Sequence, residues 1–186
     1  MNTPNILTLS RLIIVPFVII SLYIQTEETA FIALILLIVA WITDILDGHM
    51  SKKIALQTKF GAFFDPFVDK ILVSFTFIVL GDLDIVPMWL VILMLLRDYL
   101  VQGIRSMVMA EGTILKSELS GKIKFGIQMT TLIFSTFLVA LSYSFPSIKD
   151  WMFTAILSVM VFAVLQAYYA LFDFLYKNRQ IIKKWL

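Results

Sequence analysis

Four aspartates in the first half of the chain form two pairs at helical spacing. Asp44 and Asp47 lie three residues apart, and Asp65 and Asp69 lie four apart. Either spacing places both members of a pair on one face of an α-helix. Oxygen ligands without His or Cys favour hard cations, Mg²⁺ or Mn²⁺, and two such ions suit substitution at a phosphorus atom. The alternative is that these carboxylates are solvated loop charges or partners of nearby lysines, namely Lys52, Lys53 and Lys70.

The composition places these carboxylates in a membrane protein. Of the 186 residues, 60% are hydrophobic and only 15% are charged, and the mean hydropathy is +0.94. Because soluble domains contain about half apolar and about a quarter charged residues, a disordered chain and an ordinary cytosolic enzyme are excluded. The sequence has no Cys, which excludes disulfides, a thiolate nucleophile and Cys-ligated zinc. A net charge of +2 predicts no nucleic-acid partner.

Six apolar stretches are each long enough to cross a bilayer as a helix. They cover residues 6–24, 29–47, 60–80, 86–109, 119–141 and 151–176. The first lacks a basic segment before it and a small-residue cleavage site, so we expect a retained helix and not a signal peptide. No linker or repeat separates the stretches. We therefore expect a single domain over residues 1–186, an all-α integral membrane fold with six transmembrane helices.

The connecting loops differ in charge. Lys residues gather in the second and fourth loops and, with Arg179, in the tail, whereas the first and third loops carry only acidic residues. By the positive-inside rule, both termini and the second and fourth loops are cytoplasmic. The two aspartate pairs flank the second loop, so the candidate site is expected at the cytoplasmic face of the cytoplasmic (inner) membrane.

The residues around the aspartates resemble the signature of the CDP-alcohol phosphotransferase family, D-x-x-D-G-x-x-A-R, eight residues, then G-x-x-x-D-x-x-x-D. The matching positions are Asp44, Asp47, Gly48, Ser51, Lys52, Gly61, Asp65 and Asp69. Ser51 stands where the family usually has Ala, and Lys52 where it usually has Arg. The resemblance extends over nearly the whole chain, and it implies the six-helix fold of that family and a homodimer.

The resemblance also implies roles for these residues. The four aspartates would bind two Mg²⁺ or Mn²⁺ ions bridged by the diphosphate of a CDP-linked lipid, and Asp69 would be the general base. Contacts to the CDP-lipid are implied for Asn5, Thr8, Gly48, Lys52, Thr58 and Gly61. Gly48 lacks a Cβ, so it either lets the nucleotide approach the backbone or caps a helix. Lys52 keeps the positive charge of Arg and loses its bidentate fork.

Within the family, the chain most resembles the branch whose acceptor is glycerol 3-phosphate. The matching segments are Pro4–Thr8 with Arg11 and Pro16, Arg97–Tyr99 with Arg105, and Gly121–Lys124. Asp98 stands where Glu is commoner, and Phe125 stands where Thr is usual. The match predicts an acceptor alcohol that itself carries a phosphate.

Four basic side chains form the candidate acceptor pocket: Arg97, Arg105, Lys122 and Lys124. Arg97 and Arg105 are eight residues apart, roughly on one helix face. An arginine inside a membrane span needs an anion or a water-filled cavity, and an acceptor phosphate would supply the anion. The alternative for the arginines is a salt bridge with Asp98 or Asp173. For Lys124 it is a solvated position or a lipid headgroup.

Together with the candidate metal site, the resemblance implies an enzyme of phospholipid biosynthesis that transfers the phosphatidyl group of CDP-diacylglycerol to sn-glycerol 3-phosphate and releases CMP. One alternative is the same chemistry with another acceptor: inositol phosphate, phosphatidylglycerol or serine. The basic side chains argue against serine. A second alternative is a cation transporter with an acidic site, although such sites lie near the bilayer midplane and often between repeats. A third is a family member that binds nucleotide without turnover.

Overall fold

The computed structural model describes residues 3–50, 59–110 and 119–179. Backbone but no side chains are described for residues 3–11, 46–50, 59–69 and 109–110. The elements are α1 (Thr3–Ile24), α2 (Glu27–Met50), α3 (Lys59–Asp82), α4 (Met88–Ala110), α5 (Leu119–Ser144), the 3₁₀ helix η1 (Pro146–Ile148) and α6 (Lys149–Lys177). These ranges contain no strand, so the predicted all-α class is confirmed.

Each long helix coincides with one of the six apolar stretches. Most helices extend past their apolar stretch by up to three residues, because flanking polar residues can continue the hydrogen-bonded helix. The fourth stretch differs, since Val86 and Pro87 precede the helix. The carbonyl of Pro87 accepts the N–H groups of Leu90 and Val91, as expected for a proline that opens a helix and has no N–H to donate.

Two short turns join neighbouring helices. Between α1 and α2, Thr26 and Thr29 cap the new helix, because each hydroxyl accepts the other residue's backbone N–H, at 3.3 and 3.2 Å. At the end of α3, Asp84 has a left-handed φ of 55°, which aspartate tolerates. The N–H groups of Asp84 and Ile85 then bond the carbonyls of Gly81 and Leu80, the pattern of a Schellman cap.

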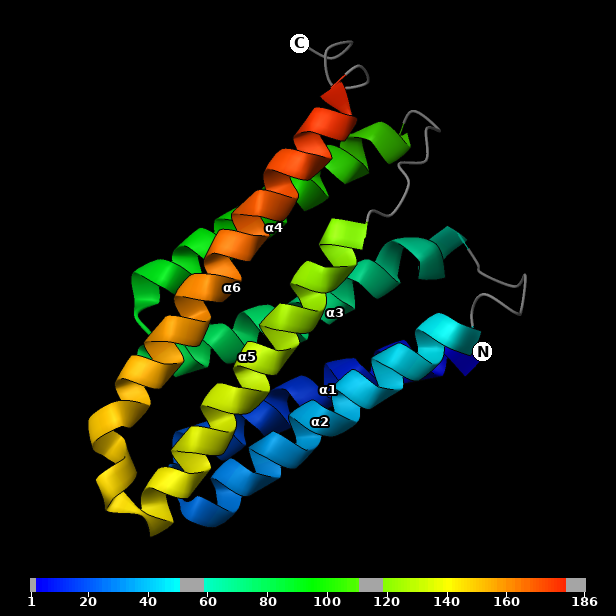
Figure 1. Cartoon of the computed structure of the whole chain (residues 1–186). Helices are drawn as coiled ribbons and strands as arrows, with labels where there is room; N and C mark the ends of the chain where they lie inside the picture. The colour runs from blue at the N-terminus through cyan, green and yellow to red at the C-terminus, as the bar shows by residue number, and fades with distance from the viewer. Residues whose placement is uncertain (1–2, 51–58, 111–118, 180–186) are drawn as a thin grey trace.

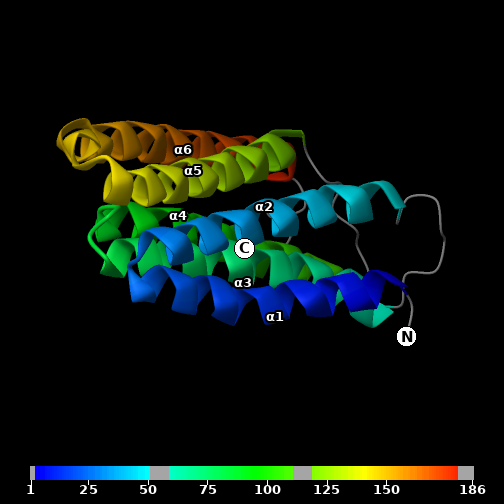
Figure 2. The same ribbon diagram turned by 90° about the horizontal axis from the view of Figure 1, so that it is seen from below.

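These turns make successive helices antiparallel. Figure 1 shows that α1, α3 and α5 begin at one end of the bundle, where α2, α4 and α6 finish. The turns after α1, α3 and α5 lie at the opposite end. In Figure 2 the helices form stacked layers, with α5 and α6 on one side and α1 on the other. The end of α2 and the start of α3, which carry the four aspartates of the family signature, therefore lie at the same end as the start of α1 and α5.

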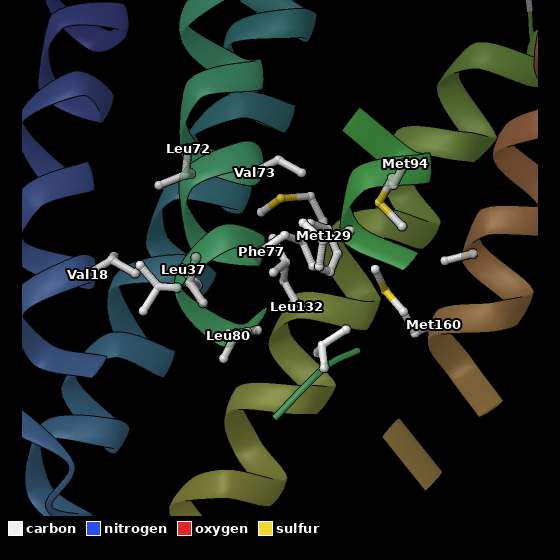
Figure 3. Packing of buried hydrophobic residues seen from close by; sticks show 14 of the residues in the cluster. Val18, Leu37, Leu72, Val73, Phe77, Leu80, Met94, Met129, Leu132 and Met160 are labelled. Carbon is white, nitrogen blue, oxygen red and sulfur yellow. The ribbon is translucent and has the colours of Figure 1, made fainter. Parts of the chain in front are cut away.

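An apolar core joins all six helices. α1 contacts α2 and α3, α5 contacts α2, α3 and α6, and α4 contacts α3 and α6. Phe77 of α3 is fully buried at the centre of the largest cluster (Figure 3). Around it lie side chains from every other long helix: Val18, Leu37, Met94, Met129, Leu132 and Met160. Burial of these side chains holds α3 against both halves of the bundle.

The outside of the bundle is apolar. Large hydrophobic side chains such as Phe17, Ile35, Leu165 and Phe172 are more than half exposed, a surface that suits lipid and not water. Three stretches of the described residues are long and apolar enough to cross a bilayer: Glu27–Ile45, Leu119–Ser144 and Pro146–Lys177. A shorter apolar segment is Leu12–Ile24. The protein is therefore a membrane protein.

Candidate functional site

The two aspartate pairs lie on helices that meet α1. Asp44 and Asp47 lie in the last two turns of α2, and Asp65 and Asp69 lie in the first half of α3. The end of α2 and the start of α3 are at the same end of the bundle (Figure 1). Both helices contact α1, and each pair lies on one face of its helix. The backbone thus brings two carboxylate pairs to one end of the bundle.

Whether these pairs bind metal depends on where the four carboxylate side chains lie. Of the four, the structure describes only the side chain of Asp44, which is partly buried. Those of Asp47, Asp65 and Asp69 are outside the described set. Among the side chains that are described, no three acidic or histidine groups gather to hold a metal. The donor chemistry nevertheless fits Mg²⁺ or Mn²⁺, since the four groups are all carboxylates presented from neighbouring helix ends. Their convergence remains a prediction.

The expected CDP-lipid contacts fall mostly outside the described side chains. Lys52 and Thr58 lie outside the described residues. Asn5 and Thr8 belong to the first two turns of α1, at the same end of the bundle as the aspartates. The two glycines of the set, Gly48 and Gly61, lie within α2 and α3. Because α2 continues to Met50, Gly48 does not end that helix, which disfavours the capping role.

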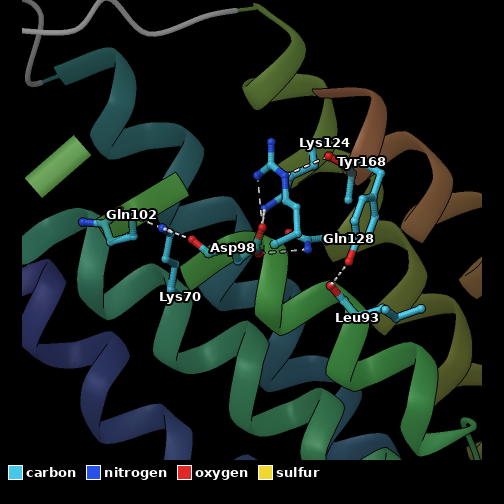
Figure 4. Close-up of polar contacts among 9 residues, drawn as sticks. Lys70, Leu93, Asp98, Gln102, Lys124, Gln128 and Tyr168 are labelled. Carbon is cyan, nitrogen blue, oxygen red and sulfur yellow. Dashed lines mark hydrogen bonds and ion pairs between the residues drawn. The ribbon is translucent and has the colours of Figure 1, made fainter. Parts of the chain in front are cut away.

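The side chains of all four expected acceptor residues are described. Two of them, Arg97 and Lys124, contact the same carboxylate. Asp98, in the middle of α4, is buried, and both of its carboxylate oxygens accept hydrogen bonds from Lys124 Nζ at 2.7 Å. Arg97 Nη1 donates at 3.1 Å, and Gln128 Nε2 donates at 3.1 Å (Figure 4). Arg97 and Lys124 are only 4% and 6% exposed. Two of the four predicted acceptor residues are therefore together, at a carboxylate between α4 and α5.

Lys70 joins this group from α3. Its Nζ donates to the backbone carbonyl of Asp98 at 3.2 Å and to Gln102 Oε1 at 2.7 Å (Figure 4). Sequence reasoning treated Lys70 only as one possible partner of the aspartates. Its position directly after Asp69, inside an apolar stretch, was the available signal. We call the set the polar cluster, and its members are Lys70, Arg97, Asp98, Gln102, Lys124 and Gln128.

Two arginines connect α4 to α6. Arg97 Nε donates to the carbonyl of Ala167 at 2.8 Å. The guanidinium of Arg105 lies 5.4 Å from the centre of the Phe174 ring, a cation–π distance. Arg105 comes three residues after Gln102 on α4, so it lies on the same side of the helix, next to the polar cluster. The eight-residue spacing thus does bring Arg97 and Arg105 to one side of α4, against α6.

The alternatives offered for these residues have different outcomes. Arg97 forms the salt bridge with Asp98 that was its alternative to an acceptor contact. Lys124 is neither solvated nor placed among headgroups, because its side chain is 7% exposed and paired with Asp98. Lys122 is exposed and is not part of the polar cluster. Of the four residues expected to form the acceptor pocket, Arg97 and Lys124 are therefore buried together at Asp98. Arg105 lies beside them, and Lys122 lies outside the group.

The polar cluster carries an excess of positive charge. Lys70, Arg97 and Lys124 supply three cations, and Asp98 is the one carboxylate among its members. In addition, the Oε1 atom of Gln128 is buried and has no hydrogen-bond partner among the described residues. Buried charges and polar groups are costly unless they are paired. The arrangement is therefore suited to an anionic ligand that also carries a hydrogen-bond donor.

Comparison with known proteins gives one family. The profile of the CDP-alcohol phosphatidyltransferases matches residues 1–165. A Bacillus subtilis protein is 37% identical over 135 residues, covering 66% of this chain and 70% of that protein. One from Rickettsia felis is 34% identical over 131 residues, covering 70% and 72%. One from Haemophilus influenzae is 32% identical over 136 residues, covering 70% and 73%. All three are named CDP-diacylglycerol–glycerol-3-phosphate 3-phosphatidyltransferase.

Proposed function

The chain belongs to the CDP-alcohol phosphatidyltransferase family, and on that premise we propose that it is a phosphatidylglycerophosphate synthase. It transfers the phosphatidyl group of CDP-diacylglycerol to sn-glycerol 3-phosphate, giving phosphatidylglycerophosphate and CMP. The observation that carries this proposal is the shared name of relatives that are 32–37% identical over most of their length. The signature from Asp44 to Asp69, in which the four aspartates and two glycines stand at the family's spacing and only Ser51 and Lys52 depart, supports the family chemistry.

The reaction needs a base for the attacking hydroxyl. Asp69 accepts the proton of a free hydroxyl of glycerol 3-phosphate, whose oxygen forms the new bond to the β-phosphorus as the bond to CMP breaks. Asp44, Asp47, Asp65 and Asp69 would hold two Mg²⁺ or Mn²⁺ ions, which when bound stabilise negative charge on the diphosphate. No covalent intermediate on the protein is needed.

The donor lipid is held at the same end of the bundle. Asn5 and Thr8 on α1, Gly48 on α2 and Gly61 on α3 belong to that end. Lys52 and Thr58 complete the proposed CDP contacts. The backbone at the two glycines lets the cytidine diphosphate approach closely. The acyl chains remain in the lipid that surrounds the apolar outer face.

The acceptor phosphate is bound by basic side chains next to α3. Arg97 and Lys124 lie in the polar cluster, and Arg105 lies beside it on α4. The excess positive charge of that cluster favours a phosphorylated acceptor over serine. Lys122, exposed on the first turn of α5, attracts the anion from the membrane surface. Inositol phosphate meets the same electrostatic requirement, so only an assay separates the two acceptors.

The six helices all cross the cytoplasmic membrane in this proposal. Both termini and the loops after α2 and α4 then face the cytoplasm, as the lysine distribution favours. CDP-diacylglycerol and glycerol 3-phosphate reach the site from that side. The protein is proposed to act as a homodimer, in keeping with the family resemblance.

The test is CMP release by the purified protein in detergent. The enzyme receives CDP-diacylglycerol, Mg²⁺ and one acceptor at a time, with Asp69→Asn and EDTA as controls. Release with glycerol 3-phosphate that is absent in both controls supports the proposal. Release only with inositol phosphate, phosphatidylglycerol or serine keeps the family and refutes the acceptor. No release with any acceptor favours the nucleotide-binding or cation-transport alternatives.

A further inference from the structure

We infer that Asp98 is a positioning residue for the acceptor, because it fixes the basic side chains that meet the acceptor phosphate. The inference rests on the proposed function for the identity of the ligand. Asp98 itself carries a negative charge and is not a phosphate contact. Its contribution is exerted through Lys124 and Arg97, which would otherwise be long side chains with many rotamers.

The hydrogen bonds around Asp98 restrict those two side chains. Lys124 Nζ lies 2.7 Å from both carboxylate oxygens, so the ammonium group has one preferred place. Arg97 is held at two points, by Asp98 Oδ1 at 3.1 Å and by the carbonyl of Ala167 at 2.8 Å. Gln128 in turn holds the second carboxylate oxygen of Asp98 at 3.1 Å. The two cations are thus oriented before any ligand arrives, which lowers the entropic cost of binding.

A purely structural role accounts poorly for this group. Removing an ion pair from water is costly, and well-packed apolar residues of similar volume often stabilise a protein as well or better. Here the ion pair is buried with side-chain exposures of 7% and 8%, and the nearby Arg97 leaves the cations in excess. A buried cluster with excess positive charge is expected where that charge serves to bind an anionic ligand.

Lys70 extends the same arrangement to the catalytic helix. It follows Asp69 on α3, and its Nζ is held by the backbone carbonyl of Asp98 and by Gln102 Oε1. The residue that positions the acceptor cations is therefore also tied to the helix that carries the proposed base. This fixes the register between the acceptor pocket on α4 and α5 and the reacting groups on α3.

The experiment separates acceptor binding from donor binding and from folding. Asp98→Asn keeps the shape and removes the charge, Asp98→Glu restores the charge, and Asp82→Asn is the matched control. Asp82 is an exposed carboxylate at the opposite end of the bundle that accepts a hydrogen bond from Tyr23. We expect Asp98→Asn to raise the KM for glycerol 3-phosphate about tenfold or more. The KM for CDP-diacylglycerol should stay unchanged, and Asp98→Glu should recover most of the loss.

A double-mutant cycle tests whether Asp98 acts through Lys124. If it does, Asp98→Asn combined with Lys124→Gln raises the acceptor KM little beyond Lys124→Gln alone. Equal increases in both KM values, or additive effects in the cycle, would overturn the inference. Should Asp98→Asn fail to fold, Lys124→Gln carries the same test, with an unchanged acceptor KM as the contrary result.

A binding measurement keeps this inference distinct from the proposed function. Glycerol 3-phosphate is added without donor lipid, and the shift in thermal unfolding is compared between wild type and Asp98→Asn. A shift in wild type that the variant loses supports the inference even if wild type releases no CMP, a result that would refute only the proposed function. Equal shifts in both proteins refute the inference alone. No shift in wild type overturns the acceptor site itself.

Discussion

The polar cluster halfway along α4 is largely buried, whereas the polar groups at one end of the bundle are exposed. That end, which holds the turns after α1, α3 and α5, is called the turn end below. In the polar cluster, Asp98 and Lys124 are buried, and their ion pair joins α4 to α5. At the turn end, Tyr23 donates to Asp82 at 2.9 Å and Ser144 donates to Glu27, and both bonds are exposed. Both regions connect helices that are distant in sequence, yet only one does so at the cost of dehydrating charges.

The difference indicates which polar groups are worth testing for function. An exposed hydrogen bond between helix ends exchanges easily with water and contributes little to stability. Buried charges inside a membrane protein are expensive, and they are commonly found where a substrate or proton is handled. Substitutions in the two regions should therefore change different quantities, activity in the first and almost nothing in the second.

The largest expected effect is on the aspartate pair of α3. Asp65→Asn removes a proposed metal ligand, and bound metal supplies several kcal/mol of transition-state stabilisation, so CMP release should fall at least about 1,000-fold. The thermal unfolding temperature should change little. Titration of Mg²⁺ in the assay checks the cause, because the variant should need more metal. Wild-type activity in this variant would contradict the assignment of the pair.

The next effect concerns the apolar core, and it should appear in stability. Phe77 is fully buried among all six helices, so Phe77→Ala should cost about 3 kcal/mol through the cavity that it leaves. Phe172, which is 66% exposed, is the matched control, and Phe172→Ala should be nearly neutral. Denaturant or thermal unfolding in detergent measures both. Equal losses in the two variants would show that burial in this bundle does not govern stability.

A smaller effect is expected beside the polar cluster. Arg105→Lys keeps the charge but loses the planar guanidinium over Phe174 and its bidentate donors. A loss of about 1 kcal/mol would raise the KM for glycerol 3-phosphate about fivefold. Arg179, whose guanidinium lies 4.6 Å from the Tyr176 ring on the exposed end of α6, provides the control. Arg179→Lys should leave the KM unchanged, and an equal rise in both variants would count against a local role.

The smallest effect is expected at the turn end. Tyr23→Phe removes the exposed hydrogen bond to Asp82, which should cost at most about 0.5 kcal/mol of unfolding free energy. CMP release should be unaffected because the proposed site is at the other end of the helices. A clear drop in activity with this variant would mean that the two ends are coupled, and the comparison above would fail.

Much of the fold could be predicted because a helix that crosses a bilayer needs a long, continuous run of apolar residues, which is visible in the sequence. Continuous apolar runs of about 20 residues predict helices well, and all six were found, with α1 and α2 starting within three residues of expectation. The start of α4 was predicted two residues early, since Val86 is apolar but Pro87 delays the helix. Helix ends are set by such local groups, to which an apolar count is insensitive.

The candidate site was only partly predictable. Helical spacing placed each aspartate pair on one face of its helix, and Arg97 with Arg105 on one side of α4. No spacing rule relates Lys124 to Asp98, which are 26 residues apart and meet only because α4 and α5 face each other. Lys70 was missed for the same reason, since its partners lie on another helix.

The sequence alone determined the class of protein, the helices and the family, because each follows from local composition or from a contiguous motif. It also fixed the four aspartates as the candidate metal ligands. The tertiary structure decided how the basic residues are used: Arg97 and Lys124 at a shared carboxylate, Lys122 outside, and Lys70 bonded to the backbone of α4. The physical reason is that the energy of a buried charge depends on the groups that surround it in space, and helix packing brings those groups together from distant parts of the chain.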